Sequence, residues 1–379
     1  MRRSLIAIAA LSTLALSLST PVQAQQASEP THIPGVAVDQ GDSLLVRADG
    51  NMLGVCTVGF VDTENNRIWT DAHCGENGAA VMDNFQNPIG TLHHVYPSEW
   101  ERLQNVRGIQ WSTNSRASDV AYVEITDPEV LGRNYFSQNS IAREPAVGDN
   151  LCNYGGRTDR VACSPIVTIN GPVVITADNG SDHGDSGGPA WIEGKGYVGQ
   201  LLGSDMVWRS DVGNFTTTVF RKIADQEINA PLDLSQPLPF YDIDVPKLRN
   251  SPVTTPATAA DVLRAKAIRD REERETMQRY WSGEELTPKR EQAREDRAHL
   301  DARESELENE VSQEADPDKK QELERDLENT RATKEVVEEY EVVIDGAIDL
   351  TEGEESAFRE IFRGLPSSWL HEFMSAFRR

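Results

Sequence analysis

The chain has 379 residues, of which 62 are Asp or Glu and 37 are Lys or Arg, so its formal net charge is −25. This acidic balance argues against nucleic-acid binding and against adhesion to anionic membranes. The length allows two domains, each able to bury a core of its own.

The N-terminus has the composition of a secretory signal peptide. Arg2 and Arg3 precede an apolar run from Leu5 to Leu18, and Val22-Gln23-Ala24 offers a small-residue cleavage site. The run is shorter than the roughly 20 residues that a membrane-spanning helix needs. We therefore expect residues 1–24 to be removed on export. The mature protein would be secreted or held at the cell envelope, without a transmembrane span.

From residue 33 to about residue 223 the sequence predicts short strands separated by turns. The runs are four to seven residues long, rich in β-branched types and bounded by Gly, Asn, Asp or Pro. Examples are 43–46, 55–61, 120–125, 165–169, 173–176 and 197–202. Many short strands without helical periods between them predict an all-β barrel or sandwich over residues 25–230. A short helix is expected over residues 220–228.

The four cysteines fall into two close pairs in the sequence, Cys56 with Cys74 and Cys152 with Cys163. Cysteines of an exported protein can oxidise, and of the three possible connectivities we expect pairing within each close pair. Each bridge would contribute roughly 3 kcal/mol in the chain-entropy model. A zinc site is the alternative, which the lack of a C-x-x-C pair disfavours. We expect no metal and no cofactor.

The composition changes after the predicted β-domain. Six prolines between residues 231 and 256 predict a linker, or a strap laid over the barrel surface. From Asp261 onward 53 of 119 residues are charged, against 46 of 260 before it. We therefore expect an acidic helical domain over residues 257–379.

Helix signals divide this tail into four segments. The first ends near residues 281–283, Thr287-Pro288 opens a second, and Asp316-Pro317 opens a third that runs towards Ile344. Thr351-x-x-Glu354 is a capping box for a fourth. Thin apolar stripes predict that the second and third helices pair as an antiparallel, coiled-coil-type hairpin. The aromatic residues from Phe358 to Phe377 would form the core of the tail, or else a helix that docks on a partner or an envelope surface.

Gly184-Asp185-Ser186-Gly187-Gly188 matches the pattern G-x-S-x-G, which is used by α/β-hydrolases. Those enzymes place their acid and histidine after the serine, but here both later histidines lie in the charged tail. Thr70-Asp71-Ala72-His73-Cys74 and then Asp119-Val120-Ala121 precede the serine. His, Asp, Ser is the chain order of the chymotrypsin-like fold.

The first domain resembles the chymotrypsin-family (trypsin-like) serine proteases, and is closest in style to their bacterial secreted branch. The resemblance rests on the motifs T-A-A-H-C, D-[IV]-A and G-D-S-G-G-P, matched at residues 70–74, 119–121 and 184–189. The resemblance implies that Cys56 is the disulfide partner of Cys74. The hairpin closed by Cys152 and Cys163 resembles one that a disulfide bridges in the bacterial branch. The resemblance covers roughly residues 33–230. It implies an all-β two-barrel chymotrypsin-like domain, followed here by a mostly α-helical C-terminal domain.

Carried over residue by residue, the resemblance makes Ser186 the nucleophile and His73 the general base and then acid. Asp119 would fix the imidazole tautomer and stabilise its protonated form. The amides of Gly184 and Ser186 would form the oxyanion hole. The segments 178–183 and 202–204 would frame the substrate pocket, with the candidate lining residues Asp182, His183, Gly203 and Ser204. Asp178 or Asp182 at its base would favour Lys or Arg, whereas solvated carboxylates would leave the specificity open.

The chain departs from the family in two places near these motifs. No Ile-Val-Gly-Gly follows the signal peptide, so the aspartate before the nucleophile, Asp185, lacks the ammonium partner that the family provides. We expect an arginine, Arg157 or Arg160, in its place. Asp71 replaces the usual alanine of the histidine motif, which would alter the packing near the base.

The sequence thus predicts a secreted serine endopeptidase that acts on protein or peptide substrates. Its helical tail would bind the catalytic domain, a partner protein or the cell envelope, for regulation or attachment. One form of regulation would have the tail fold over the cleft as an inhibitor. The alternative is a non-catalytic extracellular binding or adhesion module built on a protease-like barrel. A complete triad disfavours it, because binding alone does not need all three residues.

Overall fold

The computed structural model describes residues 33–361 except 34, 48–52, 98–108, 113–118, 143, 224–239 and 282. The expected signal peptide and the aromatic segment beyond residue 361 lie outside the described residues. Among the helices that are described, none combines the length and the apolarity that crossing a bilayer requires.

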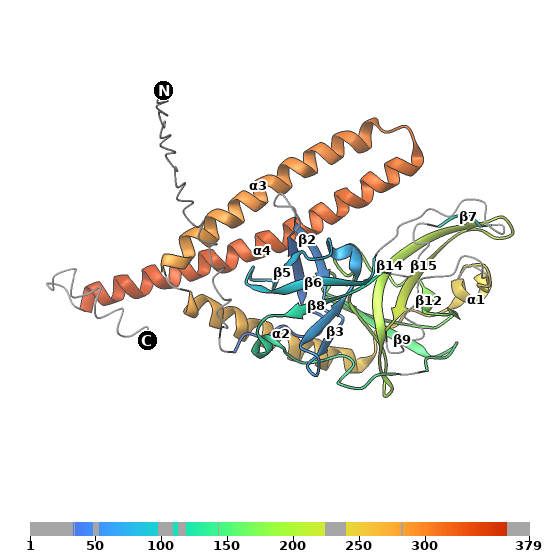
Figure 1. The fold of residues 1–379 in the computed structure, drawn as a ribbon, viewed down its shortest axis with the longest axis horizontal. Coiled ribbons are helices and arrows are strands. Elements are labelled where there is room, and N and C mark those ends of the chain that lie inside the picture. Colours follow the sequence, from blue (N-terminus) through green and yellow to red (C-terminus); the bar gives the residue numbers. More distant parts are fainter. Residues whose placement is uncertain are drawn as a thin grey trace, which may run out of the picture.

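The first half of the chain forms two antiparallel sheets (Figure 1). The first sheet has the order β2-β1-β5-β6-β8-β4-β3. Its strands are β1 (Ser43–Arg47), β2 (Leu53–Thr57), β3 (Phe60–Asp62), β4 (Arg67–Thr70), β5 (Ala80–Met82), β6 (Pro88–Tyr96) and β8 (Val120–Ile125). β-Branched and other aliphatic side chains fill its interior, and Leu44, Ile68 and Leu92 are fully buried there.

The second sheet has the order β10-β9-β13-β14-β15-β12-β11, and β7 (Ile109–Ser112) pairs with β14. Its other strands are β9 (Asn150–Gly155), β10 (Arg160–Pro165), β11 (Thr168–Asn170), β12 (Val173–Ala177), β13 (Pro189–Ile192), β14 (Gly196–Arg209) and β15 (Gly213–Lys222). Together with the helices that follow, the two sheets confirm the predicted fold class.

Three of the elements predicted for the β-domain differ from the structure. The run 55–61 is divided between β2 and β3, because the strand is interrupted at Gly59. A Cβ at Gly59 would lie 2.5 Å from the carbonyl oxygen of Gly187. The run 165–169 is divided between β10 and β11. Residues 220–222 belong to β15, which pairs with β12, so the predicted helix is wrong there, and residues 224–228 lie outside the described part.

Two disulfide bonds join Cys56 to Cys74 and Cys152 to Cys163, which confirms the predicted pairing. The first bridge ties β2 to the 3₁₀ turn η1 (Ala72–Cys74), which carries His73. The second lies between the paired strands β9 and β10, where the two cysteines are direct partners in register.

The described part of the proline-rich segment packs on the second sheet. Phe240, Ile243, Val245 and Leu248 are buried in the same core cluster as residues of β12, β14 and β15. The last two belong to α1 (Val245–Asn250), whose first turn is capped by the Asp244 carboxylate. Residues 240–250 are therefore a packed strap.

The tail contains α2 (Ala257–Tyr280), α3 (Gly283–Gln313) and α4 (Pro317–Ile361). Figure 1 shows α3 and α4 as a long antiparallel hairpin on one side of the first sheet, with α2 on the other side. The predicted fourth helix is wrong as a separate element, because α4 continues through its capping box. There the Thr351 hydroxyl donates to the Ala347 carbonyl within the helix.

A buried ion cluster attaches α2 to the first sheet. Lys266 Nζ lies 2.5 Å from Asp42 Oδ1 and 2.9 Å from Asp270 Oδ1, and Lys266 is 5 % exposed. A buried charge is tolerated when it is paired in this way, but removing one partner leaves the remaining charges uncompensated.

We expect Lys266→Met to lower the free energy of unfolding by about 3 kcal/mol, because Asp42 and Asp270 would then face each other without a cation. Urea denaturation measures the loss. Lys195→Met is the matched control: Lys195 pairs with Asp149 at the surface, so the expected loss is under about 1 kcal/mol. Equal losses in the two variants would contradict the structural role of Lys266.

Candidate active site

Asp119 holds both the backbone and the ring of His73. The His73 ring nitrogen Nδ1 lies 2.6 Å from Asp119 Oδ2, and the His73 backbone N–H donates to Asp119 Oδ1 at 2.8 Å. Asp119 is 1 % exposed and immediately precedes β8, while His73 lies in the disulfide-closed turn after β4. The carboxylate therefore fixes the ring with Nδ1 turned inward.

The charges around His73 favour its protonated form. Burial by itself lowers the pKa of His73, but the charge and hydrogen bond of Asp119 outweigh burial, and the pKa rises to about 9. In Asp119 burial favours the neutral form, yet the contact with His73 lowers the pKa of this carboxyl below its usual value. The pair is therefore suited to stabilise an imidazolium ion.

Ser186 lies on a tight turn that approaches the strand preceding His73. Gly187 has φ +82°, and a Cβ there would lie 2.2 Å from Thr70 Oγ1 and 2.6 Å from the Thr57 carbonyl oxygen. Only glycine allows this approach. The Ser186 hydroxyl makes no hydrogen bond to another described side chain. Such bonds often form at catalytic sites only when substrate is bound.

Asp71 joins the turn of His73 to the turn of Ser186. Its buried carboxylate accepts the Gly187 N–H at 2.8 Å and a Gln200 Nε2–H at 2.5 Å, and its Oδ2 lies 3.9 Å from His73 Nδ1. Burial, and then the charge of Asp119, raise the pKa of Asp71 well above its usual value. From the sequence Asp71 was only a departure from the motif, and Gln200 was missed. The signal for Gln200 was a lone amide in an apolar strand.

Backbone amides are the main partners of Asp185. Its carboxylate accepts the N–H groups of Arg157 (3.2 Å), Thr158 (2.9 Å) and Asp182 (3.0 Å), and the Thr158 hydroxyl at 3.0 Å. Burial raises the pKa of Asp185, and these hydrogen bonds oppose that shift. A Cβ on Gly155 would lie 2.2 Å from the carboxyl carbon, so glycine provides the space.

The expected arginine partner of Asp185 is therefore wrong. Arg157 contributes its backbone N–H, while its guanidinium binds Asp182 and Glu335. The Arg160 guanidinium donates to the carbonyl oxygens of Asn179 and Gly180. The sequence did not predict that Thr158 donates to Asp185. The only indication in the sequence is that Thr158 adjoins the expected partner Arg157.

The candidate pocket residues lie on the loop before Ser186 and on the neighbouring strand β14. Asp178 and Asp182 are both exposed, and Asp182 Oδ2 lies 3.0 Å from Arg157 Nη1. His183 Nε2 lies 2.9 Å from Glu328 Oε2 of α4. On β14, Gly203 has open space at its Cβ position, and Ser204 Oγ lies 3.4 Å from Ser181 Oγ. The two acidic residues are thus solvated or paired.

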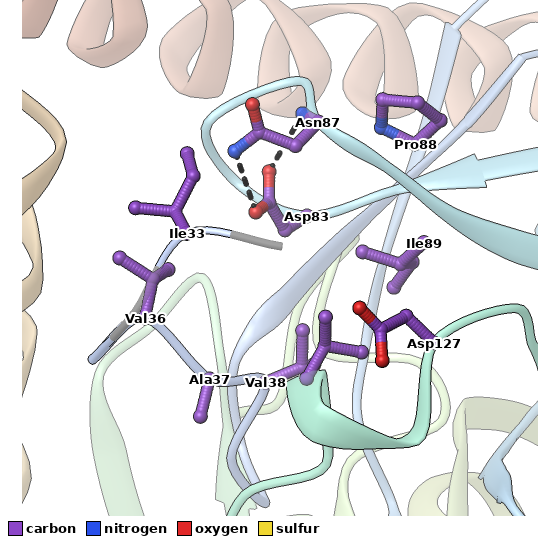
Figure 2. Close-up of a pocket in the computed structure, with 10 residues that line it drawn as sticks. Ile33, Val36, Ala37, Val38, Asp83, Asn87, Pro88, Ile89 and Asp127 are labelled. Carbon is purple, nitrogen blue, oxygen red and sulfur yellow. Dashed lines mark hydrogen bonds between the residues drawn. The ribbon is translucent and has the colours of Figure 1, made fainter. Parts of the chain in front are cut away.

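The cavity drawn in Figure 2 lies elsewhere. Neither His73 nor Ser186 lines it. The lining residues are Ile33, Val36, Ala37, Val38, Asp83, Asn87, Pro88, Ile89, Asp127 and Val130. The Asn87 side chain donates to Asp83 at its rim. Its volume is about 30 Å³.

No protein-family model matches the chain. It is similar to an uncharacterized protein, Rv1815, of Mycobacterium tuberculosis strain H37Rv, with 25% identity over 187 residues, 48% of this chain and 79% of that protein. Uncharacterized protein MT1863 of the strain CDC 1551 matches with the same identity and coverage. Neither name states an activity.

Solved structures similar to this chain include a Glu endopeptidase in complex with MPD (16% identity, TM-score 0.30, 51% of this chain and 89% of that one). A human astrovirus serine protease matches with 14% identity and TM-score 0.27 over 52% of this chain and 98% of that one. A serine endoprotease from Yersinia pestis matches with 16% identity and TM-score 0.29 over 49% and 62%. At these TM-scores we draw nothing about activity from the likeness.

We expect NMR titration to place the pKa of His73 at about 9. In Asp119→Asn the pKa should fall by more than about two units, because burial then acts without the neighbouring negative charge. Asp127→Asn, at a site away from His73, should leave it unchanged. A wild-type pKa near 6.5 would contradict the conclusion that Asp119 raises the pKa of His73.

We expect Thr158→Val to lower the free energy of unfolding by about 1–2 kcal/mol, because the buried Asp185 carboxylate loses a hydrogen-bond donor. Chemical denaturation measures it. Thr258→Val, which removes an exposed hydroxyl bonded to Glu193, should change stability by less than about 0.5 kcal/mol. A Thr158→Val protein as stable as wild type would mean that the amides alone satisfy Asp185.

Proposed function

We propose that this chain is a serine endopeptidase that uses Ser186, His73 and Asp119. The observation that carries the proposal is the His73–Asp119 pair, in which a buried carboxylate holds the ring. The turn of His73 is tied through Asp71 to the Gly187 amide beside Ser186. A serine hydroxyl is unreactive at neutral pH without an adjacent base, and the link through Asp71 between the turns of His73 and Ser186 supports His73 in that role.

In the proposed reaction Ser186 Oγ attacks the carbonyl carbon of the scissile peptide bond while His73 Nε2 takes the hydroxyl proton. Asp119 stabilises the imidazolium, and the amides of Gly184 and Ser186 donate to the oxyanion of the tetrahedral intermediate. The C–N bond then breaks as His73 returns the proton to the leaving amine. Water hydrolyses the acyl-enzyme by the same steps in reverse.

The base must be neutral to accept the Ser186 proton. Because Asp119 raises the pKa of His73 to about 9 in the resting protein, the neutral fraction grows as the pH rises towards that value. Hydrolysis by the free enzyme should therefore increase from neutral to alkaline pH.

We also propose that the protein is exported and acts on proteins or peptides outside the cytoplasm. Two observations support this location. The N-terminal 24 residues have the composition of a signal peptide, and the two disulfide bonds are of a kind that persists in oxidising compartments.

Ser186→Ala should lower kcat for peptide hydrolysis by at least about 10⁴-fold and abolish labelling by an organophosphonate probe, because both need the hydroxyl. Ser305→Ala, on the exposed surface of α3, is the matched control and should retain both. Hydrolysis and labelling are measured on the purified mature chain. A wild-type protein that neither hydrolyses a peptide library nor takes up the probe would contradict the proposal and favour the binding module.

A further inference from the structure

Two carboxylates of α4 hold residues that flank the oxyanion turn. Glu335 accepts two hydrogen bonds from the Arg157 guanidinium, at 3.0 Å from Nε and 3.3 Å from Nη2. Seven residues earlier on the same helix, Glu328 Oε2 lies 2.9 Å from His183 Nε2. Residues seven apart share a helix face, so α4 presents both carboxylates to the same loop region.

Arg157 and His183 each adjoin the residues that would form the oxyanion hole. The Arg157 backbone N–H donates to Asp185, and its Cβ and Cδ lie 3.1 and 3.2 Å from the position of a Cβ on Gly184. His183 directly precedes Gly184 in the chain. A shift of either residue would therefore move the Gly184 amide.

Apolar residues of α4 also pack against β2, next to the turn that carries Gly184. Ala332 lies between the two glutamates in the sequence, is fully buried, and belongs to one core cluster with Val55 of β2 and Val337. Val55 Cγ1 in turn lies 3.2 Å from the Cβ position of Gly184. Packing is thus continuous from α4 through β2 to the turn.

The contacts of α4 leave the reacting groups accessible. The His73 side chain is 20% exposed and Ser186 is partly exposed, although α4 lies beside them. The helix binds the rim at Arg157 and His183. This arrangement favours support of the loop over blockage of the cleft.

We propose that Glu328 and Glu335 are positioning residues, which hold His183 and Arg157 so that the amides of Gly184 and Ser186 are ready to bind the oxyanion. This inference rests on the proposed function and deepens it. The helical tail then completes the active site of the preceding domain. It supplies a fixed support for the turn that carries Gly184 and Ser186.

The effect of each glutamate should be moderate. Their side chains are 57% and 60% exposed, and solvent weakens exposed ion pairs and hydrogen bonds. In the full-length protein we expect Glu328→Gln and Glu335→Gln each to lower kcat by about threefold to fivefold, and the double variant by about tenfold. KM should change little, because the oxyanion forms only after substrate has bound.

A peptide aldehyde provides a second readout, because its hemiacetal places an oxyanion in the same hole. Its inhibition constant should rise in parallel with the loss of kcat. Glu308→Gln is the matched control: Glu308 binds Arg331 on the same hairpin and contacts neither loop, so kcat should be unchanged. In an Arg157→Gln background, Glu335→Gln should have no further effect, because Glu335 acts through Arg157.

An active wild type whose Glu328 and Glu335 variants keep their kcat and aldehyde affinity would overturn the inference and leave the proposed function standing. Faster hydrolysis by the double variant would also overturn it, since α4 would then restrain the site. A wild type that neither hydrolyses peptides nor labels at Ser186 would instead overturn the proposed function, and the positioning role with it. Thermal unfolding of each variant verifies that the fold is intact.

Discussion

The buried Asp185 carboxylate is the constraint on which the candidate active site depends. A carboxylate removed from water needs hydrogen-bond donors, and here the turn between β9 and β10 provides most of them. That hairpin is braced by the Cys152–Cys163 disulfide, and β9 also pairs with β13, which follows the Ser186 turn. The turn that carries Ser186 is therefore held from both sides by one hairpin.

A second set of buried polar contacts crosses between the two sheets. The Thr57 hydroxyl on β2 donates to the Gly184 carbonyl, and Gln200 on β14 donates to the Thr70 carbonyl at the end of β4. Asp71 adds its contact with the Gly187 amide. Hydrogen bonds in a low-dielectric interior are strong and directional, so they fix the turn that carries His73 relative to the turn that carries Ser186.

The helical tail is highly charged, yet it is attached by specific contacts with the β-domain. The Lys266 cluster fixes α2, and the apolar cluster around Ala332 fixes α4. With both anchors in place, a carboxylate on α4 can reach the rim of the candidate site. The tail therefore belongs to the architecture of that site, although its composition marks it as a separate region.

The sequence by itself determined the fold class, the disulfide pairing and the candidates His73, Asp119 and Ser186, because each is encoded in short contiguous motifs. The partners of Asp185 were decided only by the tertiary structure, since they are backbone amides and carry no side-chain signature. The contact of Glu335 with Arg157 joins residues far apart in the chain, and among so many glutamates no local pattern marks the one that pairs. The capping box at Thr351 is a local signal that predicts the start of a helix. In the structure α4 continues through it, so the local signal does not decide where this helix begins. Local chemistry thus specified which residues could react, and packing between distant segments determined how they are held.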